Sequence, residues 1–339
     1  MKIAFFGLEK KDQEVFKNAF AGADISFFEE KLDENNAAQA TDAEIISVFV
    51  NCAVNRKVID ALPNLKFIAT RSTGFDHIDT EYAATKGIKV SNVPAYGSHT
   101  VAEYAFGLIL NLSRKIIQAN NYVRSSLDFN YDKTMEGFDL KGKILGIIGT
   151  GKIGKNVAKI GRAFEMTVVA YDLYPDMAFA VENNLTYKSL PEVLAMADIV
   201  TLHAPYTKEN HHLLNKENIA KMKRGVYLIN TARGELVDTE ALVWGLKEGI
   251  IAGLGSDLLE DEQILKDAPT PKGIGVPTSE NVGKNDKILD LNHELMKMPN
   301  VIITPHIAFY TTEAVASILQ TTIENIKSFI AGSPINLVK

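Results

Sequence analysis

Residues 144–154 read ILGIIGTGKIG, a short apolar run that leads through three glycines into a helix-like segment. The apolar run has the length of a buried strand, and Gly149, Gly151 and Gly154 follow the spacing GxGxxG. A turn of this kind between a strand and a helix aims backbone N–H groups and the helix N-terminus at one point, where a phosphate can bind. Glycines at these spacings also occur in ordinary turns, so the surrounding sequence has to support this interpretation.

The sequence after the turn supplies that support. The next apolar run, MTVVAYD, ends in Asp172, 21 residues after Gly151. An acidic residue at about this distance binds the ribose hydroxyls of a dinucleotide, and its carboxylate would repel the 2′-phosphate of NADP. We therefore predict an NAD-binding Rossmann domain. The alternatives are a turn that binds no phosphate, followed by a surface aspartate, and a flavin site, for which the chain has no obvious additional region.

Short apolar runs alternate with helix-like segments along most of the chain, which indicates parallel sheets flanked by helices. A first series fills the first hundred residues and comprises KIAFFG, EIISVFV, KFIATRS and IKVSNVP. A second series begins at Ile144 and comprises ILGII, MTVVAYD, DIVTLHA, VYLINTA, AGLGSD and VIITPH. Because 339 residues exceed the usual size of one domain, we expect an α/β protein with two doubly wound parallel-sheet domains.

Two longer apolar segments frame the second series. Residues 100–123 suit one connecting helix, and residues 311–332 suit a C-terminal helix. If that last helix packs on the first sheet, the first domain is discontinuous and the second is inserted into it. The predicted domains are then residues 1–99 together with 306–339, and residues 100–305.

Charge and cysteine content exclude several classes of protein. The chain has 36 basic and 42 acidic residues, a net charge of −6, which gives no basic surface for nucleic acid or an anionic membrane. It has no run of about 18 apolar residues that could span a membrane, and no secretory signal is visible. The single cysteine, Cys52, can form no internal disulfide and cannot anchor a structural zinc site alone. We expect a cytoplasmic protein without a metal, in which Cys52 and Trp244 serve packing.

Charged and titratable residues stand directly after three strands of the second series. VYLIN leads to Arg233, AGLGSD leads to Asp257 and then to Glu262, and VIITP leads to His306. A doubly wound sheet presents its functional groups at the carboxyl ends of the strands. Taken singly, each residue has an ordinary explanation, as a solvated arginine, a surface glutamate or a hydrogen-bonded core histidine. Their joint occurrence in a predicted NAD-binding domain favours an active site.

These residue types match the reduction of a 2-oxo acid. Arg233 carries a planar, permanently charged fork that binds a carboxylate. His306 can donate a proton near neutral pH, and a neighbouring Glu262 would orient its ring. NADH would supply the hydride, so the reaction requires no metal. Weaker signals come from the histidines in polar loop-like or helical surroundings, which are His77, His99, His211, His212 and His293.

Several longer motifs resemble those of the D-isomer-specific 2-hydroxyacid dehydrogenases, and within that family the D-lactate dehydrogenase branch is the most similar. The resemblance covers nearly the whole chain and rests on RSTGFDHID, NVPAYGSHTVAEYAF, GIIGTGKIG with AYD, LHAPYTKEN, NTARGELVDTEAL, GSDLLEDE and TPHIAFYT. It implies a flavodoxin-like substrate domain, made from the N-terminal part and the C-terminal tail, with the NAD domain inserted and the active site in the cleft between them. It also implies a homodimer.

The resemblance assigns roles to individual residues. The substrate-binding arginine falls on Arg233, the proton donor on His306, and the glutamate that supports the histidine on Glu262, with Glu260 as a competing candidate. The other implied substrate contacts are Thr73 and Gly74 through their backbone N–H groups, Tyr96, Phe49 and Phe309. The implied cofactor contacts are Gly149, Gly151, Lys152, Ile153, Gly154, Asp172, His203, Ala204, Pro205, Asn210, Thr231, Ala232, Arg233, Asp257 and His306.

The leading hypothesis is an NAD-dependent D-2-hydroxyacid dehydrogenase that reduces pyruvate to D-lactate. One alternative is a related dehydrogenase for a bulkier 2-oxo acid, and another is a non-catalytic NAD-sensing regulator of the same fold. The presence of all three candidate catalytic residues argues against the regulator. The sequence leaves the preferred acid and the physiological direction open.

One stretch departs from the pattern of the family. Residues 267–287 are rich in Pro, Gly, Asn and Lys without an apolar period, so we predict a long loop there. The segment between Glu262 and His306 is thereby longer than the resemblance implies, with the extra length at residues 266–287. A surface loop, a lid and an interface segment are all compatible with this composition.

Overall fold

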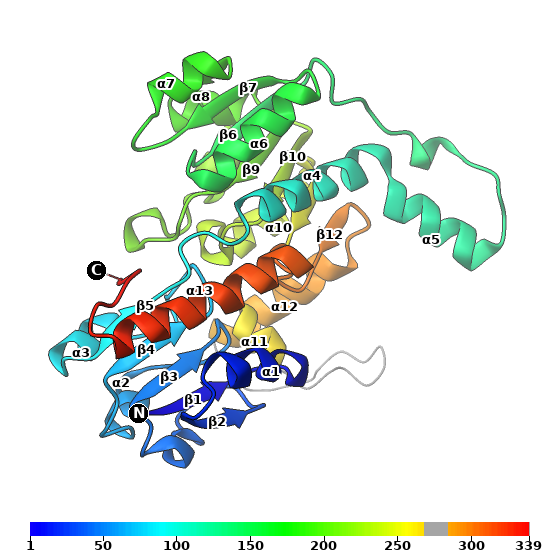
Figure 1. Ribbon diagram of the computed structural model, residues 1–339. Helices are drawn as coiled ribbons and strands as arrows, with labels where there is room; N and C mark the ends of the chain where they lie inside the picture. The colour runs from blue at the N-terminus through cyan, green and yellow to red at the C-terminus, as the bar shows by residue number, and fades with distance from the viewer. Residues whose placement is uncertain (268–283, 339) are drawn as a thin grey trace. The chain divides into compact units, whose positions relative to one another are not determined.

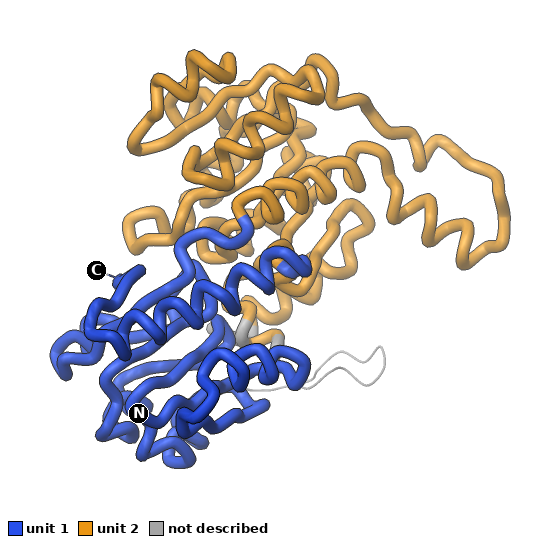
Figure 2. Tube along the Cα trace, viewed as in Figure 1, with its two compact units in different colours: residues 1–97, 310–339 blue, residues 98–309 orange. Residues whose placement is uncertain are grey.

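The computed structural model describes residues 1–267 and 284–338, and the chain divides into two compact units (Figure 2). Unit 1 consists of residues 1–97 and 310–339, and unit 2 of residues 98–309. Each unit is built on one parallel sheet, of five strands in unit 1 and seven in unit 2. The predicted fold class, α/β with two parallel-sheet domains, is confirmed.

The sheet of unit 1 has the strand order β2-β1-β3-β4-β5, which is the flavodoxin-like order. Its strands are β1 Lys2–Phe6, β2 Asp24–Phe28, β3 Ile45–Val48, β4 Phe67–Thr70 and β5 Lys89–Ser91. The sequence series did not include β2, an edge strand that pairs only with β1 and is only partly buried. Its apolar alternation is correspondingly weak.

Helices cover the sheet of unit 1, and one of them comes from the end of the chain (Figure 1). They are α1 Lys10–Ala19, α2 Arg56–Asp60, α3 Thr80–Thr85, α13 Thr312–Ile330 and the short 3-10 helix η1 Ala37–Ala40. Leu319, Ile323 and Ile326 of α13 belong to the same buried cluster as Phe5 and Phe67 of the sheet. The C-terminal tail therefore packs on the first sheet, and unit 1 is discontinuous in sequence.

The sheet of unit 2 has the order β12-β11-β10-β9-β6-β7-β8, which is the Rossmann order with one additional strand. Its strands are β6 Ile144–Ile148, β7 Thr167–Tyr171, β8 Leu185–Tyr187, β9 Ile199–Leu202, β10 Val226–Asn230, β11 Ile251–Ser256 and β12 Val301–Ile303. All of their pairings are parallel, so their carboxyl ends share one edge. The sequence series did not include β8, which has only three residues.

Most helices of unit 2 lie against its sheet, whereas the helix at residues 116–126 extends away from it (Figure 1). The helices of unit 2 are α4 Ser98–Arg114, α5 Ile116–Ser126, α6 Lys152–Ala163, α7 Met177–Glu182, α8 Leu190–Met196, α9 Lys216–Ala220, α10 Thr239–Lys247, α11 Glu262–Asp267 and α12 Lys284–Lys297, with the 3-10 helices η2 Lys133–Met135, η3 Lys208–Asn210 and η4 Gly234–Leu236. No helix within residues 1–267 and 284–338 is long and apolar enough to cross a membrane.

One expectation about a helix is wrong, and one about a loop is wrong at its two ends. Residues 100–123 do not form one helix, because Lys115 adopts a left-handed conformation with φ 55° and separates α4 from α5. α4 buries an apolar face, whereas α5 buries no residue and carries amide and basic side chains instead.

The stretch predicted as a loop, residues 267–287, is helical at both ends, since α11 reaches Asp267 and α12 begins at Lys284. The remainder, residues 268–283, lies outside the described residues.

Candidate active site

The glycine turn after β6 is shaped by close backbone contacts. Gly149 has φ 92°, and a Cβ atom there would lie 2.5 Å from the Ala204 nitrogen. A Cβ atom on Gly154 would lie 2.0 Å from the Gly149 oxygen. A Cβ atom on Gly151, by contrast, would meet nothing within 4 Å, and no side chain caps α6 at this residue. The space before α6 and its N–H groups therefore fit a pyrophosphate.

These contacts predict opposite effects for two alanine substitutions. Gly154→Ala forces backbone atoms apart, so we expect the free energy of unfolding to fall by about 1–3 kcal/mol. Gly151→Ala should lower it by no more than about 1 kcal/mol, because the new methyl group meets no protein atom and only the preference for glycine at the N-cap of α6 is lost. The same methyl group should weaken NADH binding, measured by NADH fluorescence. Equal NADH affinity in Gly151→Ala and the unchanged protein would contradict this placement of the pyrophosphate.

Asp172 stands at the end of β7 with its carboxylate held by neighbouring donors. Oδ2 accepts hydrogen bonds from the Thr150 nitrogen at 2.6 Å and from Thr150 Oγ1 at 2.8 Å, and Oδ1 accepts one from the Tyr174 nitrogen at 2.8 Å. Burial by itself would raise the pKa of Asp172, but these hydrogen bonds outweigh it and the pKa is lowered. The carboxylate is ionised near neutral pH, which suits a ribose hydroxyl and disfavours a 2′-phosphate.

Orphaned polar atoms lie at the same edge of the sheet. Within the described residues, three buried side-chain atoms have no hydrogen-bond partner: His203 Nδ1, Thr231 Oγ1 and Asn292 Oδ1. His203 and Thr231 follow β9 and β10, of which β9 pairs with β6 and β10 pairs with β9. An unsatisfied buried polar atom costs about 1–3 kcal/mol, so polar groups of a bound dinucleotide would stabilise both. The residues present fit NAD.

The buried His203 also predicts a pH dependence. Burial lowers the pKa of His203 to about 3, whereas an unfolded histidine titrates near about 6.5. Between these values the unfolded chain binds more protons, so the free energy of unfolding falls as the pH is lowered through this range. From about pH 7 to about pH 5 this one group should lower the free energy of unfolding by about 2 kcal/mol.

Denaturant unfolding of the cofactor-free protein should show this loss of stability at low pH, and His203→Asn should make the loss smaller. An equal loss in His203→Asn and in the unchanged protein would contradict the assignment, and His99→Asn, at an exposed position, is the control.

The other predicted cofactor residues hold the surrounding loops. Asn210 accepts a hydrogen bond from the Thr207 nitrogen at 2.7 Å and donates one to the Pro205 oxygen at 2.7 Å, which fixes the loop after β9. The Ala232 nitrogen donates to Asn230 Oδ1 at 3.0 Å. Lys152 is exposed at the first turn of α6, and Ile153 packs on the core. Their contacts with NAD stay predictions.

His306 and Glu262 are in direct contact. His306 Nδ1 lies 2.8 Å from Glu262 Oε1, and these residues follow β12 and β11, which are neighbours in the sheet. His306 has φ 56°, and its backbone nitrogen donates to the Asp257 oxygen at 2.9 Å. Phe309 stands edge-on to the His306 ring with their centroids 6.4 Å apart. The chain therefore fixes both the position and the environment of the imidazole.

Asp257 secures the segment that carries His306. Its carboxylate accepts hydrogen bonds from Thr304 Oγ1 at 2.5 Å, the Ile307 nitrogen at 3.0 Å and the Ala308 nitrogen at 2.8 Å. Burial raises the pKa of Asp257, against the effect of these hydrogen bonds. The sequence suggested a cofactor contact for Asp257, and the contacts in the structure show that it orders the His306 segment.

Arg233 begins the loop after β10, and that loop touches the segment of Glu262. A Cβ atom on the adjacent Gly234 would lie 2.1 Å from the Leu259 carbonyl carbon and 2.4 Å from the Glu260 nitrogen. Glu235 follows Gly234 in the chain. Burial raises the pKa of Glu235, the positive charge of Arg233 lowers it, and the negative charge of Glu262 raises it further. Arg233 and Glu262 therefore act electrostatically on one half-buried carboxyl group, Glu235, which the sequence interpretation missed.

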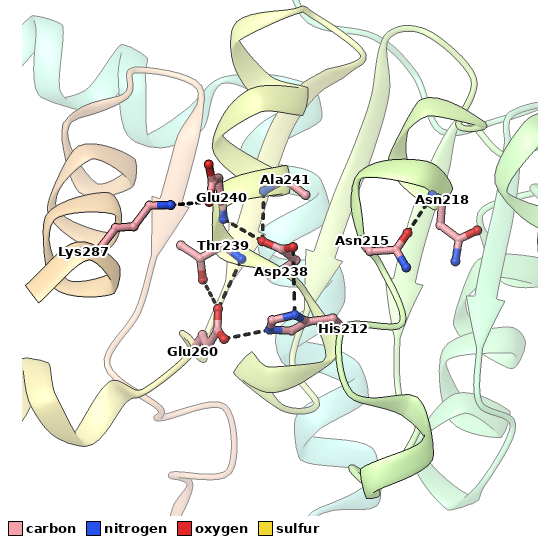
Figure 3. A network of polar contacts seen from close by, with 9 residues as sticks. All are labelled: His212, Asn215, Asn218, Asp238, Thr239, Glu240, Ala241, Glu260 and Lys287. Atoms are coloured by element: carbon pink, nitrogen blue, oxygen red, sulfur yellow. Dashed lines mark hydrogen bonds and ion pairs between the residues drawn. The ribbon is translucent and has the colours of Figure 1, made fainter. Parts of the chain in front are cut away.

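Glu260, the competing candidate, has other partners (Figure 3). Its Oε1 lies 2.7 Å from His212 Nε2, and its Oε2 accepts hydrogen bonds from the Thr239 nitrogen at 3.2 Å and from Thr239 Oγ1 at 2.7 Å. Glu262 is therefore the side-chain partner of His306, and Glu260 is the side-chain partner of His212. No sequence signal distinguished His212 from the other histidines in polar surroundings.

Two of the substrate residues predicted in unit 1, Thr73 and Gly74, lie in a hydrogen-bonded turn after β4. Thr73 Oγ1 donates to the Val93 oxygen at 2.7 Å, and Ser72 Oγ donates to the Gly74 oxygen at 2.6 Å. Arg71, which the sequence interpretation passed over, is buried and donates to the Phe6 oxygen at 2.6 Å. Burial lowers the pKa of Arg71 to about 10. The substrate roles of Thr73, Gly74, and the half-buried Phe49 and Tyr96 stay predictions.

Comparison with known proteins gives a consistent result. The family model described as "D-isomer specific 2-hydroxyacid dehydrogenase, NAD binding domain" matches residues 106–308. D-lactate dehydrogenase of Escherichia coli is 36% identical over 338 residues, 98% of each chain. An aromatic 2-oxoacid reductase of Clostridium sporogenes is 37% identical over 340 residues, 97% of this chain and 96% of the relative. The crystal structure of Aquifex aeolicus D-lactate dehydrogenase with NAD and lactic acid has a TM-score of 0.85 and 38% identity, covering 98% of this chain and 96% of that one.

A Rossmann sheet with a glycine turn, an ionised aspartate after the next strand and a His–Glu pair at the same edge define an NAD-dependent oxidoreductase. The family model that matches it describes dehydrogenases of 2-hydroxy acids. The family match and the similarity over nearly the whole length show that the chain belongs to the D-isomer-specific 2-hydroxyacid dehydrogenase family. The resemblance inferred from the motifs and the prediction of NAD are confirmed.

Proposed function

We propose that this enzyme reduces pyruvate to D-lactate with NADH. The observation that carries the proposal is the His306–Glu262 pair, placed at the strand edge that also bears Arg233 and the nucleotide turn. A charged fork, a proton donor and a nucleotide site are the three elements that reduction of a 2-oxo acid requires. A non-catalytic regulator would have no need of the ordered His306 segment.

Arg233 binds the substrate, and His306 donates the proton. The Arg233 guanidinium binds the carboxylate and fixes the position of the carbonyl group. Bound NADH supplies a hydride equivalent for C2. His306 gives its proton to the carbonyl oxygen as negative charge develops there, and we assign this transfer to Nε2 because Nδ1 contacts Glu262. Glu262 holds the ring in place, and its charge balances the protonated imidazole before the transfer.

The preference for pyruvate rests on relatives and therefore has a specific rival. The similar proteins include D-lactate dehydrogenases and a structure with lactic acid, but an aromatic 2-oxoacid reductase is equally similar in sequence. A single methylene in an apolar pocket changes discrimination by only about 10–200-fold, so a few side chains can switch the preferred acid. Reduction of a bulkier or aromatic 2-oxo acid is the second candidate function.

A panel of 2-oxo acids tests the proposal. The purified protein is mixed with NADH and with pyruvate, 2-oxoisocaproate or phenylpyruvate, and NADH absorbance is followed. We expect the highest kcat/KM with pyruvate and D-lactate as the product by chiral chromatography. A higher kcat/KM with phenylpyruvate would establish the second candidate, and no oxidation with any acid would exclude both. L-lactate as the product would contradict the assigned stereochemistry.

We also propose that the enzyme is a homodimer in the cytoplasm, which the family resemblance implies. Light scattering of the eluted protein should give twice the mass of one chain. A monomeric mass at the concentration of the activity measurement would overturn the dimer.

A further inference from the structure

Three metal-ligating side chains gather in unit 2 with no role in the proposed reaction. The ring nitrogens of His211 and His212 and a carboxylate oxygen of Glu260 lie within 4.8 Å of one another. The two imidazole rings are stacked with their centroids 3.8 Å apart and an interplanar angle of 24°. Neighbouring residues seldom present side chains side by side in this way, and His212 does so with a left-handed backbone, φ 53°. The backbone therefore brings both rings to the same carboxylate.

Glu260 is held so that one carboxylate oxygen faces His212 (Figure 3). The residue is buried, with 8% of its surface exposed. Its Oε2 is occupied by the Thr239 nitrogen and Oγ1, and its backbone oxygen accepts from Asn292 Nδ2 at 3.0 Å. Its Oε1 is left directed at His212 Nε2, 2.7 Å away. A ligand oxygen fixed by other donors is preorganised for an ion.

The other ring nitrogen of His212 also faces a carboxylate. Asp238 Oδ2 lies 3.9 Å from His212 Nδ1, while Oδ1 of the same residue accepts hydrogen bonds from the Glu240 and Ala241 nitrogens at the start of α10. Histidines that bind metals typically direct their second nitrogen at a carboxylate, which sets the ring orientation and the donor strength. His212 thus has a ligand partner on one side and a supporting carboxylate on the other.

We propose that His211, His212 and Glu260 bind a divalent transition-metal ion, with Zn²⁺ as the ion that fits best. Two imidazoles and one carboxylate are the ligands of an open zinc site, in which water completes the coordination, whereas Mg²⁺ and Ca²⁺ prefer oxygen ligands. Ligand atoms on a tetrahedral zinc ion lie about 3.3 Å apart. To reach this spacing the His211 ring, which is exposed, would turn inward, and the 2.7 Å contact between His212 Nε2 and Glu260 Oε1 would lengthen. The exposure of His211 also provides the entry path.

The experiment is a zinc titration of the full-length protein without NADH or substrate. Metal-free protein competes with a chromogenic chelator for Zn²⁺, and we expect one ion per chain. His211→Ala should weaken the affinity at least tenfold, and because this side chain is exposed the variant should fold normally. His293→Ala, a histidine on α12 outside the cluster, should bind zinc like the unchanged protein. Glu260→Gln, which keeps an acceptor for Thr239, should weaken binding as well.

Two outcomes would overturn the site. In the first, the unchanged protein binds Zn²⁺ no more tightly than His211→Ala does. In the second, equimolar Mg²⁺ displaces the bound zinc. Neither depends on turnover, so the titration can succeed even if the proposed reaction is wrong. A second readout rests on the proposed function. Glu260 stands two residues before Glu262, so zinc should inhibit pyruvate reduction by the unchanged protein and not by His211→Ala. Binding without inhibition would keep the site and overturn its link to the reaction.

Discussion

Replacing His306 with glutamine is expected to lower kcat/KM for pyruvate by about 10²–10⁴-fold, the usual contribution of a general acid. Glutamine keeps a polar side chain of similar reach but cannot deliver a proton near neutral pH. The glycine turn and Asp172 are untouched, so NADH should still bind. The measurement is NADH oxidation with pyruvate, together with NADH fluorescence in the absence of substrate.

The control for this prediction concerns the backbone. His306 has φ 56°, in the left-handed backbone region, which asparagine adopts more readily than glutamine. His306→Asn should therefore show the same loss of turnover with an unperturbed main chain. His293→Gln, at a half-buried position of α12, should remain fully active. Full activity in either His306 variant would remove the proton-donor role from this residue.

Replacing Gly234 with alanine is expected to damage both stability and turnover. The new Cβ atom would lie 2.1 Å from the Leu259 carbonyl carbon, and backbone atoms cannot rotate away as a side chain can. We expect a loss of about 1–3 kcal/mol in the free energy of unfolding. The strain separates the Arg233 loop from the segment of Glu262, and a misplacement of about 1 Å can cost about 10²-fold in rate. Denaturant unfolding and kcat/KM measure the two effects.

A matched substitution separates this clash from the general effect of alanine. Gly107 lies within α4, and a Cβ atom there would meet nothing within 4 Å. Gly107→Ala should be neutral or raise the free energy of unfolding by up to about 1 kcal/mol, because alanine favours a helix. Equal stability and turnover in Gly234→Ala and Gly107→Ala would show that the loop contact does not matter.

The parts of the fold that depend on apolar periodicity could be predicted from the sequence. Every strand of the second series was identified except β8, and every strand of the first except β2, both of which lie at the edge of a sheet. A strand that pairs on one side has a weaker burial pattern, so periodicity is least informative there. The break at Lys115 was also missed, because only the tertiary packing of α4 shows where its apolar face ends.

The candidate site shows where residue patterns stop being informative. The strand ends drew attention to Arg233, Glu262 and His306. The spacing typical of the family favoured Glu262 but left Glu260 as a competing candidate. That choice follows from which carboxylate reaches the imidazole after the chain has turned at Asp261, which has φ 54°. The contacts of Gly234 and Asp257 were equally hidden, since they join segments that are far apart in sequence.

The return of α13 to the first sheet has a consequence for the order of folding during synthesis. Strands β1 to β5 leave the ribosome first, yet the apolar face that carries Phe5 and Phe67 is completed only by residues of α13. Unit 2 is continuous in sequence and can close its core while that face is still uncovered. The earliest part of the nascent chain is therefore the last to mature, and the interval before α13 emerges is when it is most prone to aggregation or to need a chaperone.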